Sequence, residues 1–225
     1  MGQLRTGGAI FLSAGVPDPS VKHYLGPADT VAISAAVSAL LQVTLGRRRL
    51  VWGGHPSITP IVWAFAESMG VDYADWVLLY QSLYFKDEFP EETEKFQNVV
   101  FTDRVDGDLL GSLDLMRNRM IEETEFEAAV FVGGMKGILD EYKMFARKAP
   151  QASILPIMST GGAAAVLGET IAASRVFMTN LDYVALMYEQ LHIKPNEKRY
   201  ARVADQPAEL ADRIEHPGHS KRGHQ

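Results

Sequence analysis

Glycine pairs follow three apolar runs of this sequence, and a helical pattern follows each pair. The pairs are Gly53-Gly54, Gly133-Gly134 and Gly161-Gly162. Each unit therefore indicates a strand, a tight turn and a helix, because glycine ends a strand and the helical spacing resumes after it. Repeated units of this kind build an α/β protein, in which crossover helices return each strand in the same direction. This alternation is the strongest constraint on the fold.

Six short apolar runs have the residue types of buried strands. Apolar residues at helical spacing lie between them, for example over residues 29–45 and 106–123. We therefore predict a doubly wound, mostly parallel α/β sheet with helices on both faces, a Rossmann-like three-layer sandwich. The expected strands are residues 9–12, 49–52, 76–80, 99–101, 128–132 and 153–158.

Composition places the chain among ordinary globular proteins, with 225 residues, 47% hydrophobic and 22% charged. It contains no cysteine, which excludes disulfides, thiol catalysis and cysteine-ligated zinc. We expect one domain over residues 1–192 and a C-terminal extension over residues 193–225. The extension has few large apolar residues, so it is expected to be largely flexible. Its histidines His216, His219 and His224 have no fixed framework, and we expect neither a metal site nor a cofactor.

Charge and hydropathy bear on location and partners. The formal net charge of −6 argues against a surface that binds nucleic acid. No secretory signal is apparent at the N-terminus, and no window has the roughly 18 apolar residues that a membrane span requires. We expect a cytoplasmic protein that binds a small molecule or another protein, and neither nucleic acid nor a membrane.

The glycine pairs suggest where a ligand binds. Ligands of open parallel sheets bind at the carboxyl ends of the strands, and glycine allows the backbone to approach them closely. Free N–H groups at the start of the following helix favour phosphate. Turn formation alone remains the alternative, since neither G-x-G-x-x-G nor G-x-x-x-x-G-K-[ST] is complete. The expected ligand-binding residues are Ser13, Gly15, Gly53, Gly54, His55, Ser57, Gly133, Gly134, Met135, Lys136, Gly137, Thr160, Gly161 and Gly162.

Two segments carry a family resemblance: LVWGGHPSITPIV, and MRNRM ahead of AAVFVGGMKGILDE. They resemble the SLOG superfamily, which includes the Lonely Guy nucleotide phosphoribohydrolases and lysine-decarboxylase-like proteins. The resemblance covers roughly residues 10–173. In those hydrolases a loop of the form PGGxGTxxE follows a helix with an arginine, and together they hold a nucleoside monophosphate and cleave its base–ribose bond. The resemblance implies that Glu141 and Arg119 are the catalytic pair.

The sequence departs from that hydrolase motif. Val132 replaces the proline, and Lys136-Gly137 with one extra residue before Glu141 replaces the Gly-Thr pair. These departures put hydrolysis in question and leave nucleotide binding intact. The Gly-Gly-His-Pro loop at Gly53 is similar to SLOG domains proposed as sensors of nucleotide-derived signals in bacterial antiphage systems.

Each candidate residue also has a structural alternative. Glu141 lies three residues after Ile138, near the buried face of its helix, so it can serve a ligand or form an ion pair with Arg119. His55 and Ser57 can contact a ligand or only cap and brace the turn. The acidic segment 81–96 is a solvated face, or a lid in which Gln81, Tyr84 and Phe85 cover a base.

Three classes of function remain open. The first is a module that binds or senses a nucleotide-derived small molecule, related to NAD, ADP-ribose or a nucleoside phosphate, and reports it to an effector protein. The second is a hydrolase of the N-glycosidic bond in a nucleoside monophosphate or an NAD-like compound. The third is a structural interaction protein. Relatives commonly form dimers, so the resemblance also implies a homo-oligomer.

Overall fold

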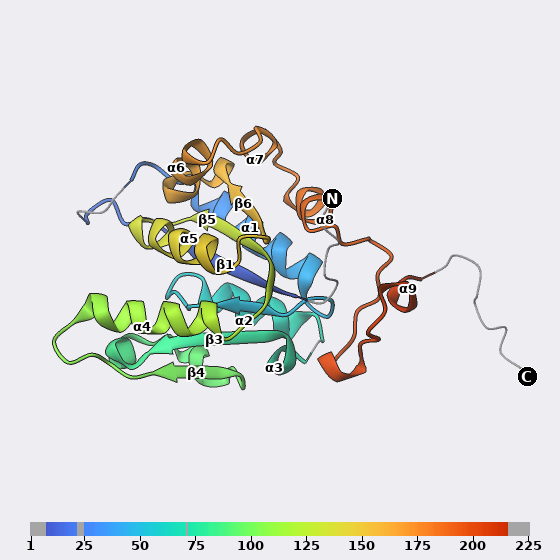
Figure 1. Ribbon diagram of the computed structural model, residues 1–225, viewed down its shortest axis with the longest axis horizontal. Coiled ribbons are helices and arrows are strands. Elements are labelled where there is room, and N and C mark those ends of the chain that lie inside the picture. Colours follow the sequence, from blue (N-terminus) through green and yellow to red (C-terminus); the bar gives the residue numbers. More distant parts are fainter. Residues whose placement is uncertain (1–7, 22–24, 71, 216–225) are drawn as a thin grey trace, which may run out of the picture.

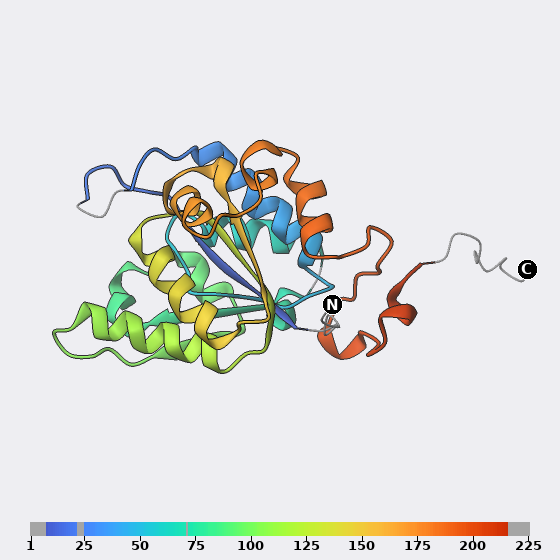
Figure 2. The ribbon, with the colours of Figure 1, turned by 45° about the horizontal axis from the view of Figure 1, so that its top comes forward.

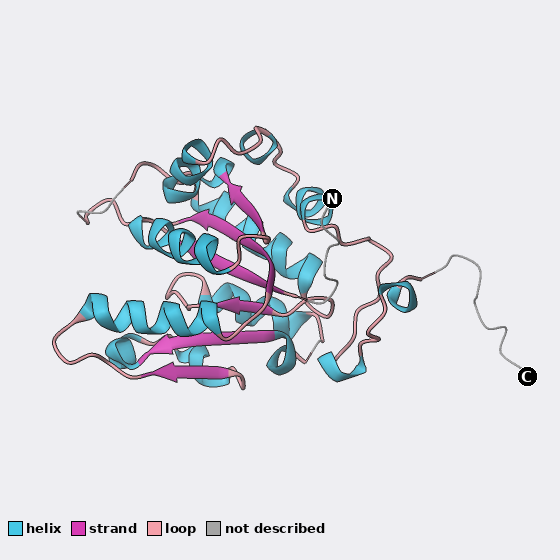
Figure 3. Cartoon of the chain, in the orientation of Figure 1, coloured by secondary structure: helices cyan, strands magenta, loops and turns pink. Residues whose placement is uncertain are grey.

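The computed structural model describes residues 8–21, 25–70 and 72–215 (Figure 1). These residues form a six-stranded, fully parallel sheet between two layers of helices (Figure 3). The predicted doubly wound α/β fold is therefore confirmed. The strands are β1 (Ala9–Gly15), β2 (Leu50–Trp52), β3 (Val77–Ser82), β4 (Val99–Thr102), β5 (Phe126–Gly133) and β6 (Ser153–Ile157).

The strand order β4-β3-β2-β1-β5-β6 makes β1 and β5 neighbours in the middle of the sheet. The chain steps outward from β1 to β4, crosses back to β5 and then continues to β6. The connections after β1 and β5 therefore leave in opposite directions, which opens a crevice beyond their carboxyl ends. β1 is longer than the sequence predicted, because it stays paired with β5 as far as Gly15 opposite Gly133.

Helices cover both faces of the sheet (Figure 2). Alternate residues of β1 divide the core: Ile10 and Leu12 pack on one side, and Ala9 and Phe11 on the other. The first face is covered by α1 (Thr30–Thr44), α2 (Thr59–Ser68) and α8 (Tyr183–Gln190), and the second by α4 (Leu109–Glu122), α5 (Lys136–Lys148) and α6 (Gly162–Thr170).

Side-chain caps fix the starts of three of these helices. Asp29 accepts hydrogen bonds from the N–H groups of Val31 and Ala32 at the start of α1. Asp108 accepts one from the N–H of Gly111 at the start of α4. In α8 the Asp182 carboxylate accepts a hydrogen bond from the N–H of Ala185.

The start of α5 has no side-chain cap. The N–H of Ile138 donates to the carbonyl of Met135, whereas those of Lys136 and Gly137 have no acceptor among the described residues and remain open to another one.

Shorter elements complete the fold. The helices α3 (Tyr73–Trp76), α7 (Val176–Thr179) and α9 (Leu210–Arg213) have four residues each. The acidic segment after β3 forms the 3₁₀ helices η1 (Leu83–Glu88) and η2 (Glu91–Lys95), and two further ones are η3 (Met158–Thr160) and η4 (Val203–Asp205). Within the described ranges, no helix has the length and apolar character needed to cross a membrane.

The C-terminal extension is anchored as far as residue 215, at the end of the sheet away from the arrowheads in Figure 1. Glu197 is 2% exposed and accepts a hydrogen bond from Arg48 Nη1 at 2.6 Å. The Gln206 amide donates to the carbonyl of Arg47. This buried charge network orders a segment that its polar composition suggested to be flexible. Residues 216–225, with the three tail histidines, lie outside the described residues.

Candidate functional site

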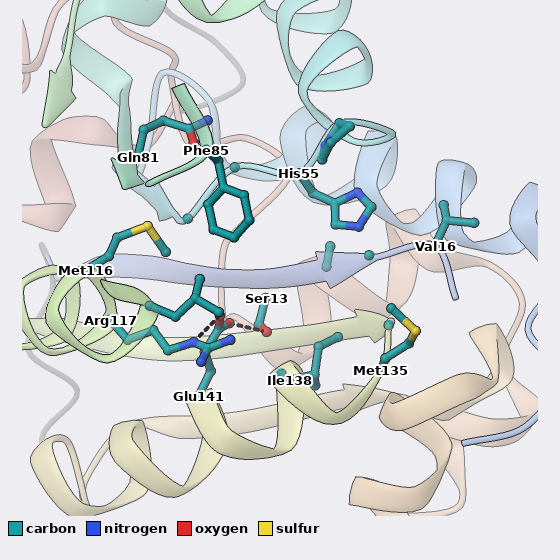
Figure 4. A pocket seen from close by; sticks show the side chains of 18 of the residues that line it. Ser13, Val16, His55, Gln81, Phe85, Met116, Arg117, Met135, Ile138 and Glu141 are labelled. Atoms are coloured by element: carbon teal, nitrogen blue, oxygen red, sulfur yellow. Dashed lines mark hydrogen bonds and ion pairs between the residues drawn. The ribbon is translucent and has the colours of Figure 1, made fainter. Parts of the chain in front are cut away.

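A cavity of about 430 Å³ lies beyond the carboxyl ends of the strands (Figure 4). The loops after β1, β2 and β5 border it, together with the segment after β3 and the facing sides of α4 and α5. Its lining is mostly apolar, with a few polar groups, which is typical of small-molecule sites. The lining residues are Ser13, Ala14, Gly15, Val16, Gly53, Gly54, His55, Pro56, Gln81, Phe85, Glu88, Phe89, Pro90, Leu113, Met116, Arg117, Gly134, Met135, Gly137, Ile138 and Glu141.

The Glu141 carboxylate is held by two side chains from other elements. The Ser13 hydroxyl donates to Oε2 at 2.6 Å, and Arg117 Nε donates to Oε1 at 3.2 Å. β1, α4 and α5 each contribute one member, so the fold alone brings them together (Figure 4). A carboxylate fixed in this way can accept hydrogen bonds from sugar hydroxyls or orient a water molecule.

Arg119 is not the partner of Glu141, contrary to the assignment from the resemblance. Its Nε donates to Glu123 at 2.7 Å, its side chain is 46% exposed, and it does not line the cavity. Residues two apart in an α-helix project about 200° from each other. Arg117 and Arg119 therefore face opposite ways, and Arg117 occupies the position expected of Arg119.

Arg117 also reaches the start of α5. A Cβ atom at Gly137 would lie 2.9 Å from Arg117 Nη2, so the guanidinium lies against the first turn of that helix. This turn begins at Lys136 and has no side-chain cap. A helix start carries a partial positive charge and free N–H donors. The guanidinium and the helix start therefore present positive charge and N–H donors at the same corner of the cavity, which can bind an anion.

Gly133 and Gly134 shape the loop that leads into α5. Their φ angles are +58° and +70°, which favour glycine. The N–H of Gly134 donates to the carbonyl of Gly15 at 2.7 Å, which ties the ends of β1 and β5 together. The N–H of Gly133 donates to the Thr160 hydroxyl at 2.9 Å. Gly134 lines the cavity, whereas Gly133 and Thr160 support the loop from behind.

The other two glycine loops differ from the α5 loop. At the start of α6, the N–H groups of Gly162 and Ala163 donate to the carbonyls of Pro27 and Gly134. At the start of α2, the N–H groups of Ile58 and Thr59 both donate to the carbonyl of His55. Protein acceptors thus occupy these donors. None of these three helices, all within the described residues, has a side-chain cap. At the start of α5 the N–H of Ile138 donates to the carbonyl of Met135, whereas the N–H groups of Lys136 and Gly137 have no acceptor among the described residues.

His55 lines the cavity as a neutral imidazole with a defined tautomer. Its Nδ1 accepts a hydrogen bond from the N–H of Ser57 at 3.2 Å, so the ring proton lies on Nε2. Nε2 lies against Gly15, where an added Cβ would be 3.3 Å away. Burial lowers the pKa of His55 below its ordinary value of 6.5, because desolvation disfavours the charged ring. The Ser57 side chain is exposed and does not line the cavity.

The lowered pKa of His55 predicts a pH effect on stability. As the pH is lowered from about 7.5 to 5.5, the unfolded chain takes up a proton at this histidine before the folded protein does. The free energy of unfolding therefore decreases as the pH is lowered. Each pKa unit corresponds to about 1.4 kcal/mol at most. Urea unfolding of the wild type should show a steeper decline than His55→Gln over this range. A His55 pKa above 6.5, measured by NMR titration, would contradict the prediction.

Some of the site residues predicted from the sequence line the cavity, and others do not. Lys136 is half exposed and pairs with Asp140 at 2.6 Å, away from the cavity lining. Those that line the cavity are Ser13, Gly15, Gly53, Gly54, His55, Gly134, Met135, Gly137 and Glu141. Those that do not are Ser57, Arg119, Gly133, Lys136, Thr160, Gly161 and Gly162.

Sequence reasoning did not assign Arg117, Leu113 and Met116 to the site. The helical spacing over residues 106–123 predicts α4, and the structure shows that Leu113 and Met116 of this helix face the cavity. Gln81 and Phe85 do line the cavity, as the lid hypothesis allowed, whereas Tyr84 does not. In the described part of the chain, no group of three or more acidic or histidine side chains is placed to hold a metal ion.

Comparison with known proteins identifies the family. The family model described as the SLOG cluster3 family matches residues 23–191, about three quarters of the chain. Searches of curated proteins and of solved structures gave no match. The SLOG match indicates nucleotide-related binding or a glycosidase-like function. This chain belongs to the SLOG cluster3 family.

Proposed function

We propose that this protein binds a nucleotide-derived small molecule in the cavity at the carboxyl edge of the sheet. One observation carries the proposal: the uncapped start of α5 and the Arg117 guanidinium face the same cavity as the fixed carboxylate of Glu141. A phosphate suits the first two groups, and a ribose suits the third. Their shared cavity therefore matches a molecule that carries both.

The phosphate is placed at the start of α5. There the backbone N–H groups and the Nη2 atom of Arg117 supply donors and positive charge. The Nε atom of Arg117 is engaged by Glu141, and Nη1 lies 3.9 Å from Asp114 Oδ1. These contacts fix the guanidinium and leave Nη2, which lies against Gly137, for the ligand. Gly137 supports this role, because any side chain there would press against the guanidinium.

The ribose is placed at Glu141. Both carboxylate oxygens have a protein donor, yet each oxygen can accept a second hydrogen bond, so hydroxyl groups of a sugar can still bind. The volume of about 430 Å³ lies toward the lower end of the range of roughly 300–1,000 Å³ for small-molecule sites. We therefore place one nucleoside phosphate unit in the cavity, either as a mononucleotide or as part of NAD or ADP-ribose.

Sensing without turnover is supported by the loop sequence. Val132 and the Lys136-Gly137 pair replace residues of the hydrolase motif. In our proposal the occupied cavity acts as a signal that a partner protein reads, which fits a role in antiphage signalling.

Hydrolysis of an N-glycosidic bond is the second candidate function. It is favoured by the Ser13, Glu141 and Arg117 arrangement, in which a carboxylate lies beside the proposed ribose position. A carboxylate there can activate water or stabilise the developing positive charge of the sugar. Chromatography of nucleoside monophosphates and NAD after incubation tests this candidate. Released base that persists unchanged in Glu141→Ala would contradict the assigned role of Glu141.

Calorimetric titration tests the binding proposal. The panel contains adenosine monophosphate, adenosine, NAD and ADP-ribose. We expect saturable binding of at least one phosphate-bearing compound. Adenosine should bind more weakly by about tenfold or more, since it lacks the phosphate that would contact Arg117 and the start of α5. Folded protein that binds none of the phosphate compounds, or binds adenosine equally well, would contradict the proposal.

A further inference from the structure

Gln81 places an unused amide in the cavity. It is the fifth residue of β3, its exposure is 7%, and it lines the cavity. Its side chain forms no hydrogen bond with any other described residue. The amide atoms are not sealed in the core but open to the cavity, where they can donate and accept hydrogen bonds. An amide in this position therefore points to a ligand group.

The neighbouring loop is shaped around this amide. Gly54 has a φ of +67°, and a Cβ atom there would collide with the Nε2 and Cδ atoms of Gln81. Gly54 also lines the cavity. The glycine thus gives the Gln81 amide the space that it occupies, and the loop after β2 fixes its position.

An aromatic ring lies on the same side of the cavity. Phe85 interrupts the helical geometry of η1, with φ −101° and ψ 19°, and its side chain lines the cavity. Tyr84 contacts the Phe85 ring edge-on, with ring centroids 5.2 Å apart, but does not itself line the cavity. In Figure 4, Gln81 and Phe85 enter from the side opposite to Arg117 and Glu141.

We infer that Gln81 and Phe85 form the subsite that recognises the nucleobase of the ligand. The inference rests on the proposed function, which places the phosphate and ribose on the other side of the cavity. A carboxamide offers one donor and one acceptor side by side, which matches the polar edge of a nucleobase. The Phe85 ring offers a stacking surface for the planar base. The class of ligand is therefore a nucleotide with an intact base, and a sugar phosphate alone leaves this subsite empty.

Paired titrations test the inference. Adenosine monophosphate and ribose 5-phosphate are titrated into the wild type, Gln81→Met, Phe85→Leu and Tyr84→Leu. Gln81→Met keeps the length of the side chain and removes both polar groups, and Tyr84→Leu is the matched control outside the cavity lining. We expect Gln81→Met and Phe85→Leu to weaken binding of the nucleotide about tenfold or more, with the affinity for ribose 5-phosphate unchanged. Tyr84→Leu removes an edge contact of the Phe85 ring but no group of the cavity lining, so it should weaken nucleotide binding less than Phe85→Leu does and leave ribose 5-phosphate unchanged.

The outcomes separate this inference from the proposed function. If the wild type binds ribose 5-phosphate as tightly as the nucleotide, the assignment of Gln81 and Phe85 to the nucleobase is contradicted. The proposed phosphate position at Arg117 and the start of α5 is then still supported. If Gln81→Met weakens both ligands equally, the residue acts on the fold and the inference is overturned. If the folded wild type binds neither ligand, the proposed function and the inference fail together.

Discussion

Arg117→Ala is expected to weaken binding of a nucleoside monophosphate about 100-fold, whereas Arg119→Ala should leave it unchanged. Arg117 contacts Glu141 through Nε and lies against the first turn of α5 with Nη2. Its removal takes away donors for the phosphate and leaves the negative charge of Glu141 without its guanidinium. Arg119 is bound to the exposed Glu123, outside the cavity.

Calorimetry with both variants measures this difference. The two substitutions are identical in kind and lie two residues apart on α4, so they are matched for the intrinsic effect on the helix. Urea unfolding of each variant shows whether it remains folded under the titration conditions. Equal affinities of Arg117→Ala and the wild type for the nucleotide would contradict the proposed phosphate position at Arg117. A loss of affinity confined to Arg119→Ala would support the assignment of Arg119 that the resemblance implied.

Gly133→Ala is expected to lower the free energy of unfolding by about 3 kcal/mol. The φ of +58° is unfavourable for alanine, and the added Cβ would lie 2.7 Å from the carbonyl oxygen of Gly15. That oxygen belongs to the backbone of β1, which is paired with β5 and cannot move away at low cost. The junction of the two central strands would have to shift.

Gly107→Ala provides the control for backbone strain. Gly107 has a φ of +69°, but an added Cβ there meets no atom within 4 Å. Its substitution should cost about 1 kcal/mol from the positive φ alone. Urea unfolding of both variants measures the difference, which reports the steric cost at the β1–β5 junction. Equal losses of stability would contradict this explanation of the glycine pair.

The alternation of apolar runs and helical patterns predicted the sheet because strand and helix periods are local properties of the chain. The glycine pairs predicted the edge of the sheet that carries the cavity, since positive φ angles at Gly54, Gly133 and Gly134 require glycine. These signals depend on residues close together in the sequence. The predicted fold was confirmed for this reason.

The choice between Arg117 and Arg119 depends on long-range packing. Both arginines flank the apolar stripe of α4, and only the position of α5 decides which of them meets Glu141. The same holds for the unpaired Gln81 amide, which is recognised only when its partners in space are known. The anchoring of the C-terminal extension likewise depends on the buried pair of Arg48 and Glu197, whose residue types usually indicate an exposed segment.

A crystal structure of the protein with adenosine monophosphate bound is the most direct test of the proposed site. The account predicts phosphate oxygens at the N–H groups that begin α5 and at Nη2 of Arg117, with the ribose hydroxyls at Glu141. A phosphate at the start of α2 or α6, or a nucleotide outside the cavity, would contradict it.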